Sequence, residues 1–350
     1  MQLITGIQQV GVGVKNATEA KYLYRDLFGM NILLFDDQAS ADLMTRYTGD
    51  QVQQRRAIFS LNMQGGGGFE IWQFTSRSPL EYPGILAIGD IGIFSIKIKA
   101  FDVQKTYVHF KENKEVMLSP LFLSPEGKQH FWLKDLYGNI FNIVEARSWF
   151  KKNKNLCGGV AGAVIGVADM ERALDFYKNV LGIDQIVYDI TAPITDGPAE
   201  KGDPKLCRRV LLTKPTASEG AFSKLLGCIQ IELIELREGT PGKIFKDRFW
   251  GDCGFIHLCF DVSDMEKLKQ RAEKSSYHFT VDSNDSFAME AAAGRFCYVE
   301  DPSGTLIELV ETHKVPVLKK WGLYLDLKNR KTNKPLPDWM VSLLGLNKIK

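Results

Sequence analysis

The chain has 350 residues, of which 45% are hydrophobic and 25% charged, as in a globular protein with a sizeable core and about two domains. Its net charge of +2 gives no reason to expect a nucleic acid or a membrane surface as a partner, and no apolar run is long enough to cross a bilayer. The six cysteines form no CxxC pair, so we expect free thiols and a cytoplasmic protein.

The first predicted elements are a strand at residues 7–14 and a helix that follows it. Alternate valines of the strand share one face and Gln9 lies on the other. The helix begins after Asn16, a residue that caps helices well, and ends at Gly29, where a left-handed residue is needed. The glycine run 65–68 is interpreted as a hairpin turn before a strand that carries Glu70, because no Lys-Ser/Thr or helix pattern follows it.

The same order of elements returns twice in the middle of the chain. The second copy opens with a strand that carries Ser95 and closes, after a turn, with one that carries Asn142. The third copy superposes on the first at a constant offset, with Asp169 as the helix cap and Gly182 as the helix end. Residues 190–205, rich in Pro, Gly and Asp, are predicted to form a long loop.

The fourth copy has the clearest ends. Its opening strand, 255–262, has large apolar residues on one face and His257 on the other, so His257 has the same position and parity as Gln9. Its last hairpin has good turn chemistry at residues 301–304 and leads to a strand that carries Glu308.

A long internal repeat decides the architecture. The predicted fold is α+β, with four βαβββ modules paired into two cupped mixed sheets. The expected modules are residues 1–76, 86–148, 157–238 and 250–313. They give two domains, 1–148 and 157–313, followed by a C-terminal tail, 314–350. Apolar residues such as Trp321 and Leu344 predict that the tail packs back on the body.

Such a repeated module resembles the vicinal oxygen chelate superfamily, which includes glyoxalase I, extradiol dioxygenases and the bleomycin resistance proteins. The resemblance covers about 310 residues on these module limits. Its most specific pieces are DPSGTLIEL at residues 301–309 and VADMERALDFY at residues 167–177. It implies that two modules form a cup around a divalent metal, each with one ligand from its opening strand and one from its closing strand.

When these ligand positions are transferred to the four modules, some of them fall on good metal ligands and others on poor ones. In order of module, the positions fall on Gln9 and Glu70, Ser95 and Asn142, Gly162 and Glu232, and His257 and Glu308. Glycine has no ligand atom, and neutral serine and asparagine are weak ligands. Pairing of neighbours would leave only a three-ligand site, whereas a crossed pairing of modules one with four and two with three gives one full set. We favour the crossed pairing, whose set resembles the metal shell of glyoxalase I.

Each of these residues also has a purely structural interpretation. Glu308 could be a surface residue on a half-exposed strand, but it shares its strand face with Leu306 and Val310, where a carboxylate needs a partner or a metal. Glu70, after the glycine run, could also be a surface residue. A lone strand histidine such as His257 is often a satisfied core residue, and Gln9 could be a hydrogen-bonding cavity residue. His109, His278 and His313 are expected to be structural or exposed.

The resemblance implies a metal-dependent lyase or isomerase of the glyoxalase type. It would act on a small oxygen-chelating substrate through an enediolate, with Glu308, and after it Glu70, as the catalytic carboxylate. The metal would be Zn, Ni, Fe, Mn or Co, among which this shell does not choose.

Two alternatives remain open at this point. One is a non-catalytic small-molecule-binding protein of the resistance type, because the two middle modules have lost their ligands. The other is an Fe(II) extradiol-type dioxygenase, which wants two histidines and one carboxylate, although Gly162 stands in the place of the first histidine. Four modules can complete both cups within one chain, so a monomer and a homodimer are both compatible with the sequence.

Overall fold

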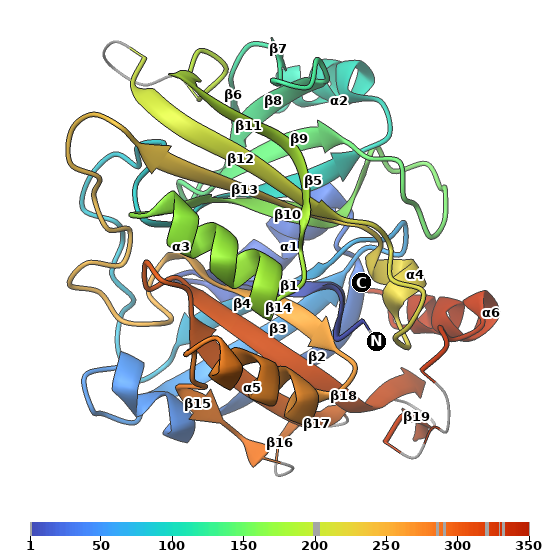
Figure 1. Ribbon diagram of the computed structural model, residues 1–350. Coiled ribbons are helices and arrows are strands. Elements are labelled where there is room, and N and C mark those ends of the chain that lie inside the picture. The colour runs from blue at the N-terminus through green and yellow to red at the C-terminus, as the bar shows by residue number, and fades with distance from the viewer. Residues whose placement is uncertain are drawn as a thin grey trace.

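The computed structural model describes residues 2–198, 204–284, 287–289, 292–318, 322–328, 330 and 333–349. Within these residues the chain forms two mixed β-sheets, which lie one above the other in Figure 1. The first sheet has ten strands. Its order is β15 (Val281–Asp282), β17 (Ala292–Glu300), β18 (Leu306–Leu318), β14 (Gly254–Val262), β1 (Ile4–Gly13), β4 (Gly68–Phe74), β3 (Gln54–Leu61) and β2 (Ile32–Ser40), with β16 (Phe287–Met289) on β17 and β19 (Leu323–Asp326) on β18.

The second sheet, among the same described residues, has nine strands. Its order is β11 (Gln185–Pro193), β12 (Leu206–Lys214), β13 (Ile229–Leu236), β10 (Cys157–Gly166), β5 (Gly92–Ala100), β9 (Ile140–Glu145), β8 (Gln129–Lys134) and β6 (Met117–Leu118), with β7 (Phe122–Leu123) on β8. The helices are α1 (Ala17–Phe28), α2 (Val103–Lys111), α3 (Met170–Asp175), α4 (Ser223–Leu226), α5 (Met265–Lys274) and α6 (Asp338–Ser342). In the described part of the chain, no helix is long and apolar enough to span a bilayer.

The modules pair in the crossed manner. Strand β1 of the first module lies antiparallel to β14 of the fourth, and β5 of the second lies antiparallel to β10 of the third. Each sheet therefore joins strands from both halves of the chain, and the expected ranges 1–148 and 157–313 each contribute to both sheets. We call the concave side of the ten-stranded sheet the first cup and that of the nine-stranded sheet the second cup.

The helices begin and end where their capping residues stand. The Asn16 side chain accepts hydrogen bonds from two backbone amides of the first turn of α1, and Asp169 does the same for α3 through one amide. Gly29 and Gly182 follow the two helices in the left-handed region, at φ 66° and 67°. The third-module helix differs from the prediction because it continues after α3 as a π-helical turn, Phe176–Val180.

Two tyrosines tie helices to turns of neighbouring modules. Tyr24 of α1 donates to Asp135 at 2.9 Å, in the turn between β8 and β9. Tyr177 donates to Asp301 at 3.1 Å, in the turn between β17 and β18. Both contacts are buried in the largest apolar core, which contains residues of both sheets and of α1, α2, α3 and α5. This core holds the two sheets together and leaves their concave sides for the cups.

The glycine run is the hairpin turn that the sequence predicts, and it also joins the two sheets. Gly67 forms an isolated bridge with Val160 of β10, and the Gly159 amide donates to the Gly65 carbonyl at 2.8 Å. A Cβ at Gly66 would lie 2.7 Å from the backbone of Gly159, so only glycine permits this close approach.

Two expectations need adjustment. The range 190–205, predicted as a loop, begins as a strand, because β11 runs to Pro193 as the antiparallel partner of β12. Residues 199–203 of this range lie outside the described residues. The tail is in part a strand, since β18 continues to Leu318 and β19 pairs with it. Leu344 is buried against the first cup, as predicted, whereas Trp321 lies outside the described residues.

Candidate metal centre

Four adjacent strands of the first sheet each deliver one of the predicted residues. In sheet order these are Glu308 on β18, His257 on β14, Gln9 on β1 and Glu70 on β4. All four side chains are buried, and the exposed fraction of His257 is 0%. The crossed pairing thus brings together residues that are as much as 299 positions apart in the sequence.

The strand register explains why these positions meet. In the first module Glu70 stands opposite Gly11, two residues after Gln9, and in the fourth Glu308 stands opposite Cys259, two residues after His257. The middle modules keep the same offset, with Lys97 opposite Asn142 and Val164 opposite Glu232. Because side chains alternate with period two, each opening-strand residue and its closing-strand residue lie on the same concave face.

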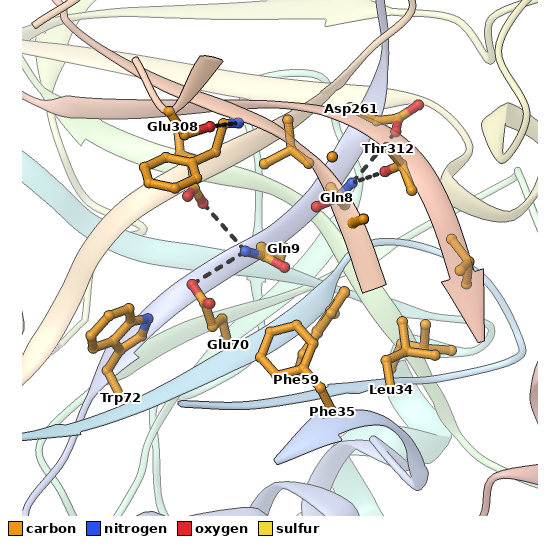
Figure 2. Close-up of a pocket in the computed structure, with 18 of the residues that line it drawn as sticks. Gln8, Gln9, Leu34, Phe35, Phe59, Glu70, Trp72, Asp261, Glu308 and Thr312 are labelled. Carbon is orange, nitrogen blue, oxygen red and sulfur yellow. Dashed lines mark hydrogen bonds between the residues drawn. The ribbon is translucent and has the colours of Figure 1, made fainter. Parts of the chain in front are cut away.

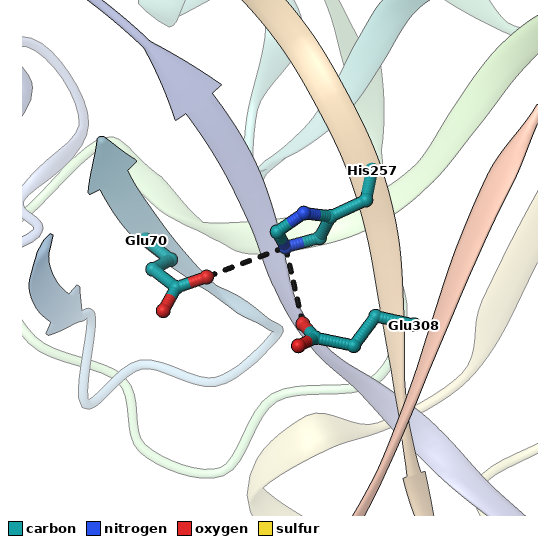
Figure 3. Close-up of side chains that lie close together, drawn as sticks. All are labelled: Glu70, His257 and Glu308. Atoms are coloured by element: carbon teal, nitrogen blue, oxygen red, sulfur yellow. Dashed lines mark ion pairs between the residues drawn. The ribbon is translucent and has the colours of Figure 1, made fainter. Parts of the chain in front are cut away.

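Glu70, His257 and Glu308 form a compact cluster, which we call the Glu–His–Glu cluster (Figure 3). The His257 Nε2 atom lies 3.1 Å from Glu308 Oε2 and 3.3 Å from Glu70 Oε2. One ligand atom from each of the three residues lies within 4.8 Å of the other two. Three buried donors that converge from three strands are the arrangement that a bound cation requires.

Gln9 lies between the two carboxylates (Figure 2). Its Nε2 atom donates to Glu70 Oε2 and to Glu308 Oε2, each at 3.2 Å. The amide nitrogen therefore contacts the carboxylates, although only the amide oxygen could act as a metal ligand. The position of Gln9 agrees with the predicted shell, and its service as a ligand would require the amide to turn.

The charges of the cluster depend on one another. Burial alone would lower the pKa of His257, but the charges and hydrogen-bonding atoms of Glu308 and Glu70 outweigh it and raise that pKa to about 9. Burial would raise the pKa of Glu308, and the imidazolium of His257 lowers it below its ordinary value. The two buried carboxylates thus need a positive charge between them, which the protonated imidazole supplies.

The donor set fits a divalent cation. His257 Nε2 lies within ion-pair distance of both carboxylates, but neither contact has the geometry of a hydrogen bond. Both carboxylates and the imidazole nitrogen therefore point at one position, where a cation that replaces the imidazole proton would be bound. One imidazole, two carboxylates and an adjacent amide are suitable ligands for Zn, Ni, Fe, Mn or Co.

Residues outside the predicted set hold His257 in place. The Tyr298 hydroxyl lies 3.3 Å from the other ring nitrogen, Nδ1, and the Trp250 ring stacks on the imidazole at 6.4 Å between centroids. Gly11 faces His257 across the strand pair, and a Cβ there would lie 2.4 Å from the imidazole Cε1. No sequence pattern had singled out Tyr298, Trp250 or Gly11 as neighbours of His257. A glycine in a valine-rich strand was the one available signal of close approach.

The cluster opens into a cavity of about 320 Å³ (Figure 2). Glu70, Glu308 and Gln9 line it, and most of the other walls are apolar. Arg55 also lines it and forms an ion pair with Asp37 at 2.9 Å. The apolar wall residues include Leu34, Phe35, Phe59, Trp72, Phe222, Leu226, Trp250, Phe296, Val310 and Leu344. The cavity combines a polar metal-binding end with an apolar body, as small-molecule sites do.

The second cup holds its own cation. Lys97 Nζ forms an ion pair with Glu232 at 2.8 Å and donates to Asn142 Oδ1 at 3.2 Å, so an ammonium group lies between the two closing-strand positions. Arg209 also pairs with Glu232 at 2.6 Å. The charges of Lys97 and Arg209 lower the pKa of Glu232 well below its ordinary value, against the effect of its burial.

The remaining predicted positions of the second cup carry no ligand set. The Ser95 hydroxyl is buried and far less suited to a metal than imidazole. A Cβ at Gly162 would lie 1.8 Å from the Gln230 carbonyl oxygen, so this position cannot take a ligand unless the strands move. His109 lies in α2 and is exposed, in agreement with the prediction. No three of the described His, Cys, Asp and Glu residues come together in this cup as the Glu–His–Glu cluster does.

Comparison with known protein families identifies the fold. The model of the Glyoxalase/Bleomycin resistance protein/Dioxygenase superfamily matches residues 159–309. No curated protein matches the chain.

Solved structures extend the glyoxalase fold to the rest of the chain. A putative dioxygenase from Bacillus subtilis is 14% identical, with a TM-score of 0.56 over 89% of this chain and 86% of its own. Glyoxalase I from Zea mays is 13% identical, with a TM-score of 0.52 over 87% of this chain and 92% of its own. At such identities the likeness shows the fold alone. The resemblance inferred from the repeat is thus confirmed, and the predicted α+β fold with two cupped sheets with it.

Proposed function

We propose that the first cup is the divalent-metal centre of a lyase or isomerase of the glyoxalase type, with a small oxygen-chelating substrate. The observation that carries the proposal is the convergence of the buried side chains of Glu70, His257 and Glu308 on one position. A divalent ion bound there would act as a Lewis acid on adjacent oxygens of a substrate. Gln9 would complete the shell through its amide oxygen.

The protein groups around such a substrate would control its proton. A carboxylate within reach of the carbon beside the chelating oxygens can remove its proton and return it to the neighbouring carbon. Glu308 is the first candidate for this role, since it lines the cavity and its pKa is below the ordinary value, so it is ionised at neutral pH. Glu70 lines the cavity on the other side of Gln9 and is the second candidate.

The remaining groups would orient and shield the reaction. Tyr298 and Trp250 hold the imidazole of His257, so the ligand set keeps its geometry. The apolar walls exclude water from the charged end, which strengthens electrostatic interactions there. Residues from the second half of the chain, such as Phe222 and Leu226, contribute to these walls.

The test has a metal arm and a proton-transfer arm. Metal analysis of the purified protein, after incubation with Zn²⁺, Ni²⁺, Mn²⁺, Co²⁺ or Fe²⁺ and dialysis, is expected to find about one ion per chain. Hydroxyacetone in D₂O is the probe for proton transfer, followed by NMR as loss of carbon-bound hydrogen. Glu308→Gln should keep the metal and lose exchange by at least about 100-fold. Glu311→Gln is the matched control, because Glu311 is on the same strand but not in the cavity wall.

The outcomes separate the candidate functions. A protein that takes up none of these ions would contradict the metal centre and favour a binding protein of the resistance type. Exchange that is unchanged in Glu308→Gln would remove Glu308 from the mechanism. The dioxygenase alternative is the weaker one, because the cluster has one histidine and two carboxylates, whereas that chemistry prefers two histidines and one carboxylate.

A further inference from the structure

The cavity of the first cup contains a second polar group, away from the Glu–His–Glu cluster. It consists of Gln8, Asp261, Thr312 and Thr5, which we call the distal cluster. Gln8 Nε2 donates to Thr312 Oγ1 at 3.1 Å and approaches Asp261 Oδ1 at 3.5 Å (Figure 2). The Thr5 hydroxyl donates to Asp261 Oδ2. Gln8, Asp261 and Thr312 line the same cavity as Glu70 and Glu308.

The strands fix the spacing between the two polar groups. Asp261 follows His257 by four residues on β14, and Thr312 follows Glu308 by four residues on β18. Four residues of a strand return the side chain to the same face about 13 Å further along. Val310 lies between Glu308 and Thr312 and lines the cavity. The wall of the cavity thus has a metal-binding end, an apolar middle and a second polar end.

A regular strand would not allow Gln8 and Gln9 to line one cavity, because neighbouring side chains alternate between faces. The pairing of β1 with β14 contains a register irregularity between Ile7 and Gln9. Such bulges re-aim side chains in a strand. This irregularity places two consecutive glutamines in the cavity wall, one at each polar cluster.

Asp261 has unused capacity to accept a hydrogen bond. Its exposed fraction is 5%, and none of the described lysines or arginines forms an ion pair with it. Its Oδ1 atom has one contact, with Gln8, at a distance where a hydrogen bond is weak. Burial raises the pKa of Asp261 to about 6, against the hydrogen bonds from Thr5 and Gln8. A buried carboxylate with so little compensation is costly unless a ligand donates to it.

We propose that the distal cluster is a second recognition site, which binds a hydroxyl group at the far end of an elongated, apolar substrate. Asp261 would accept from the hydroxyl, and Gln8 would hydrogen-bond its oxygen. The chelating oxygens of the same substrate would lie at the Glu–His–Glu cluster. The placement of these chelating oxygens rests on the proposed function. The two polar clusters are about 13 Å apart along the strands. Subtraction of the lengths of a metal–oxygen bond and a hydrogen bond leaves about 8 Å between the two ends of the substrate.

The test uses three compounds that lack a chelating group, so that it does not depend on the metal. They are 4-phenylbutan-1-ol, its methyl ether, which accepts but cannot donate, and 4-phenylbutanoate, which is negatively charged. Binding is measured in EDTA by tryptophan fluorescence, since Trp72 and Trp250 line the cavity. The alcohol is expected to bind about 10-fold more tightly than the ether, and the acid more weakly than both.

Variants then assign the effect to Asp261. Asp261→Asn should reduce the alcohol-to-ether ratio at least about 3-fold and strengthen binding of the acid, because the repelling carboxylate is gone. Glu311→Gln removes a nearby carboxylate that does not line the cavity, and it should leave all three affinities unchanged. If Asp261→Asn does not fold, the wild-type ratio of alcohol to ether decides alone.

The outcomes distinguish the distal cluster from the metal centre. Equal binding of alcohol and ether to the wild-type protein, or no binding of any of the three compounds, overturns the proposal. An unchanged ratio in folded Asp261→Asn also overturns it. His257→Ala should keep the ratio, so failure of metal uptake would leave the result for the distal cluster intact.

Discussion

The two cups are built from the same module with the same register, yet they hold positive charge in different ways. In the first cup two glutamates, a histidine and a glutamine surround a position suited to an ion, beside a cavity of about 320 Å³. In the second cup the Lys97 ammonium lies between Asn142 and Glu232, and the cavity there is about 20 Å³. One cup is open for a ligand and the other is filled by side chains.

The difference lies in two strand positions. Lys97 stands where the first cup has Gly11 and Cys259, small residues that leave room. Gly162 stands where the first cup has a ligand, and the neighbouring backbone leaves no space for a side chain. A lysine attached to the fold neutralises Glu232 permanently, which a removable ion cannot do. The same fold therefore places equivalent positions in both cups, and single residues at those positions decide whether a cup can bind a ligand.

The largest expected effect separates the cups by metal content. His257→Ala removes the imidazole of the first cup, and bound metal should fall from about one ion per chain to less than about a tenth of that. The measurement is elemental analysis after dialysis against a defined free-metal concentration. His130→Gln, a buried histidine of the second cup, is the matched control and should keep its metal. Equal loss in both variants would contradict a single metal-binding cup.

The second cup should respond in stability rather than in metal content. Lys97→Met removes the ammonium and leaves Glu232 with Arg209 as its remaining cation. Removal of one partner from a buried ion pair costs about 3–5 kcal/mol, and we expect about 3 because Arg209 stays. Urea unfolding measures the loss, and Lys105→Met on α2 serves as an exposed control with a change below about 0.5 kcal/mol. A stable Lys97→Met protein would show that the lysine is not needed to hold the second cup.

A pH experiment compares equivalent charges of the two cups. Lys99 on β5 and Asp261 on β14 are both four residues beyond the first ligand position of their strand, and both are buried. Burial lowers the pKa of Lys99 to about 8, below its ordinary value of 10.5. Between these values the unfolded chain binds the proton and the folded chain does not, so the free energy of unfolding rises with pH. Over the whole interval the free energy of unfolding should rise by about 3 kcal/mol.

The variant Lys99→Met isolates this contribution. Urea unfolding between pH 8 and pH 9.5 should show a rise in the wild-type protein, relative to the variant, of about 2 kcal/mol. At acid pH, Asp261 should change the free energy of unfolding in the opposite direction. Its pKa is raised from 3.8 to about 6, so the stability it contributes falls as the pH rises through that interval. Parallel pH curves for wild type and Lys99→Met would show that the buried amine keeps its ordinary pKa.

The smallest expected effect tests the space reserved for His257. Gly11→Ala places a methyl group against the imidazole, and overpacking of this kind costs about 1–3 kcal/mol. The displaced ring should also weaken metal binding by about 10-fold. Titration with a chromophoric chelator measures the affinity. Gly84→Ala, in a loop where a Cβ meets nothing closer than 3.5 Å, should change neither quantity. Unchanged metal affinity in Gly11→Ala would mean that the imidazole can move without loss of the site.

Much of the fold could be predicted because its signals are local. The caps at Asn16 and Asp169, the left-handed Gly29 and the turn at residues 301–304 act within a few residues of themselves, and each lies where expected. The ligand positions were implied by the family resemblance, and the strand register has the same offset between opening and closing strands in all four modules.

Other features depend on contacts that no local pattern encodes. Nothing in the sequence distinguishes Lys97, because its role depends on an ion pair with Glu232. Glu232 lies 135 residues later, on a strand of another module. Tyr298 and Trp250 reach His257 only after the sheets form. The distal cluster depends on an irregular register within β1, which places Gln8 beside Gln9 in the wall of the cavity.

Local patterns in the sequence were enough to predict the repeated module and its α+β class, since these follow from periodicity, caps and turns. The four pairs of candidate positions came from the resemblance to the vicinal oxygen chelate superfamily. Only the tertiary structure decided which pairs share a cup, because pairing depends on hydrogen bonds between β1 and β14 and between β5 and β10. It also decided that the first cup has a cavity of about 320 Å³ and the second one of only about 20 Å³. Space is set by side chains that meet from distant strands, and no single segment of the chain contains that information.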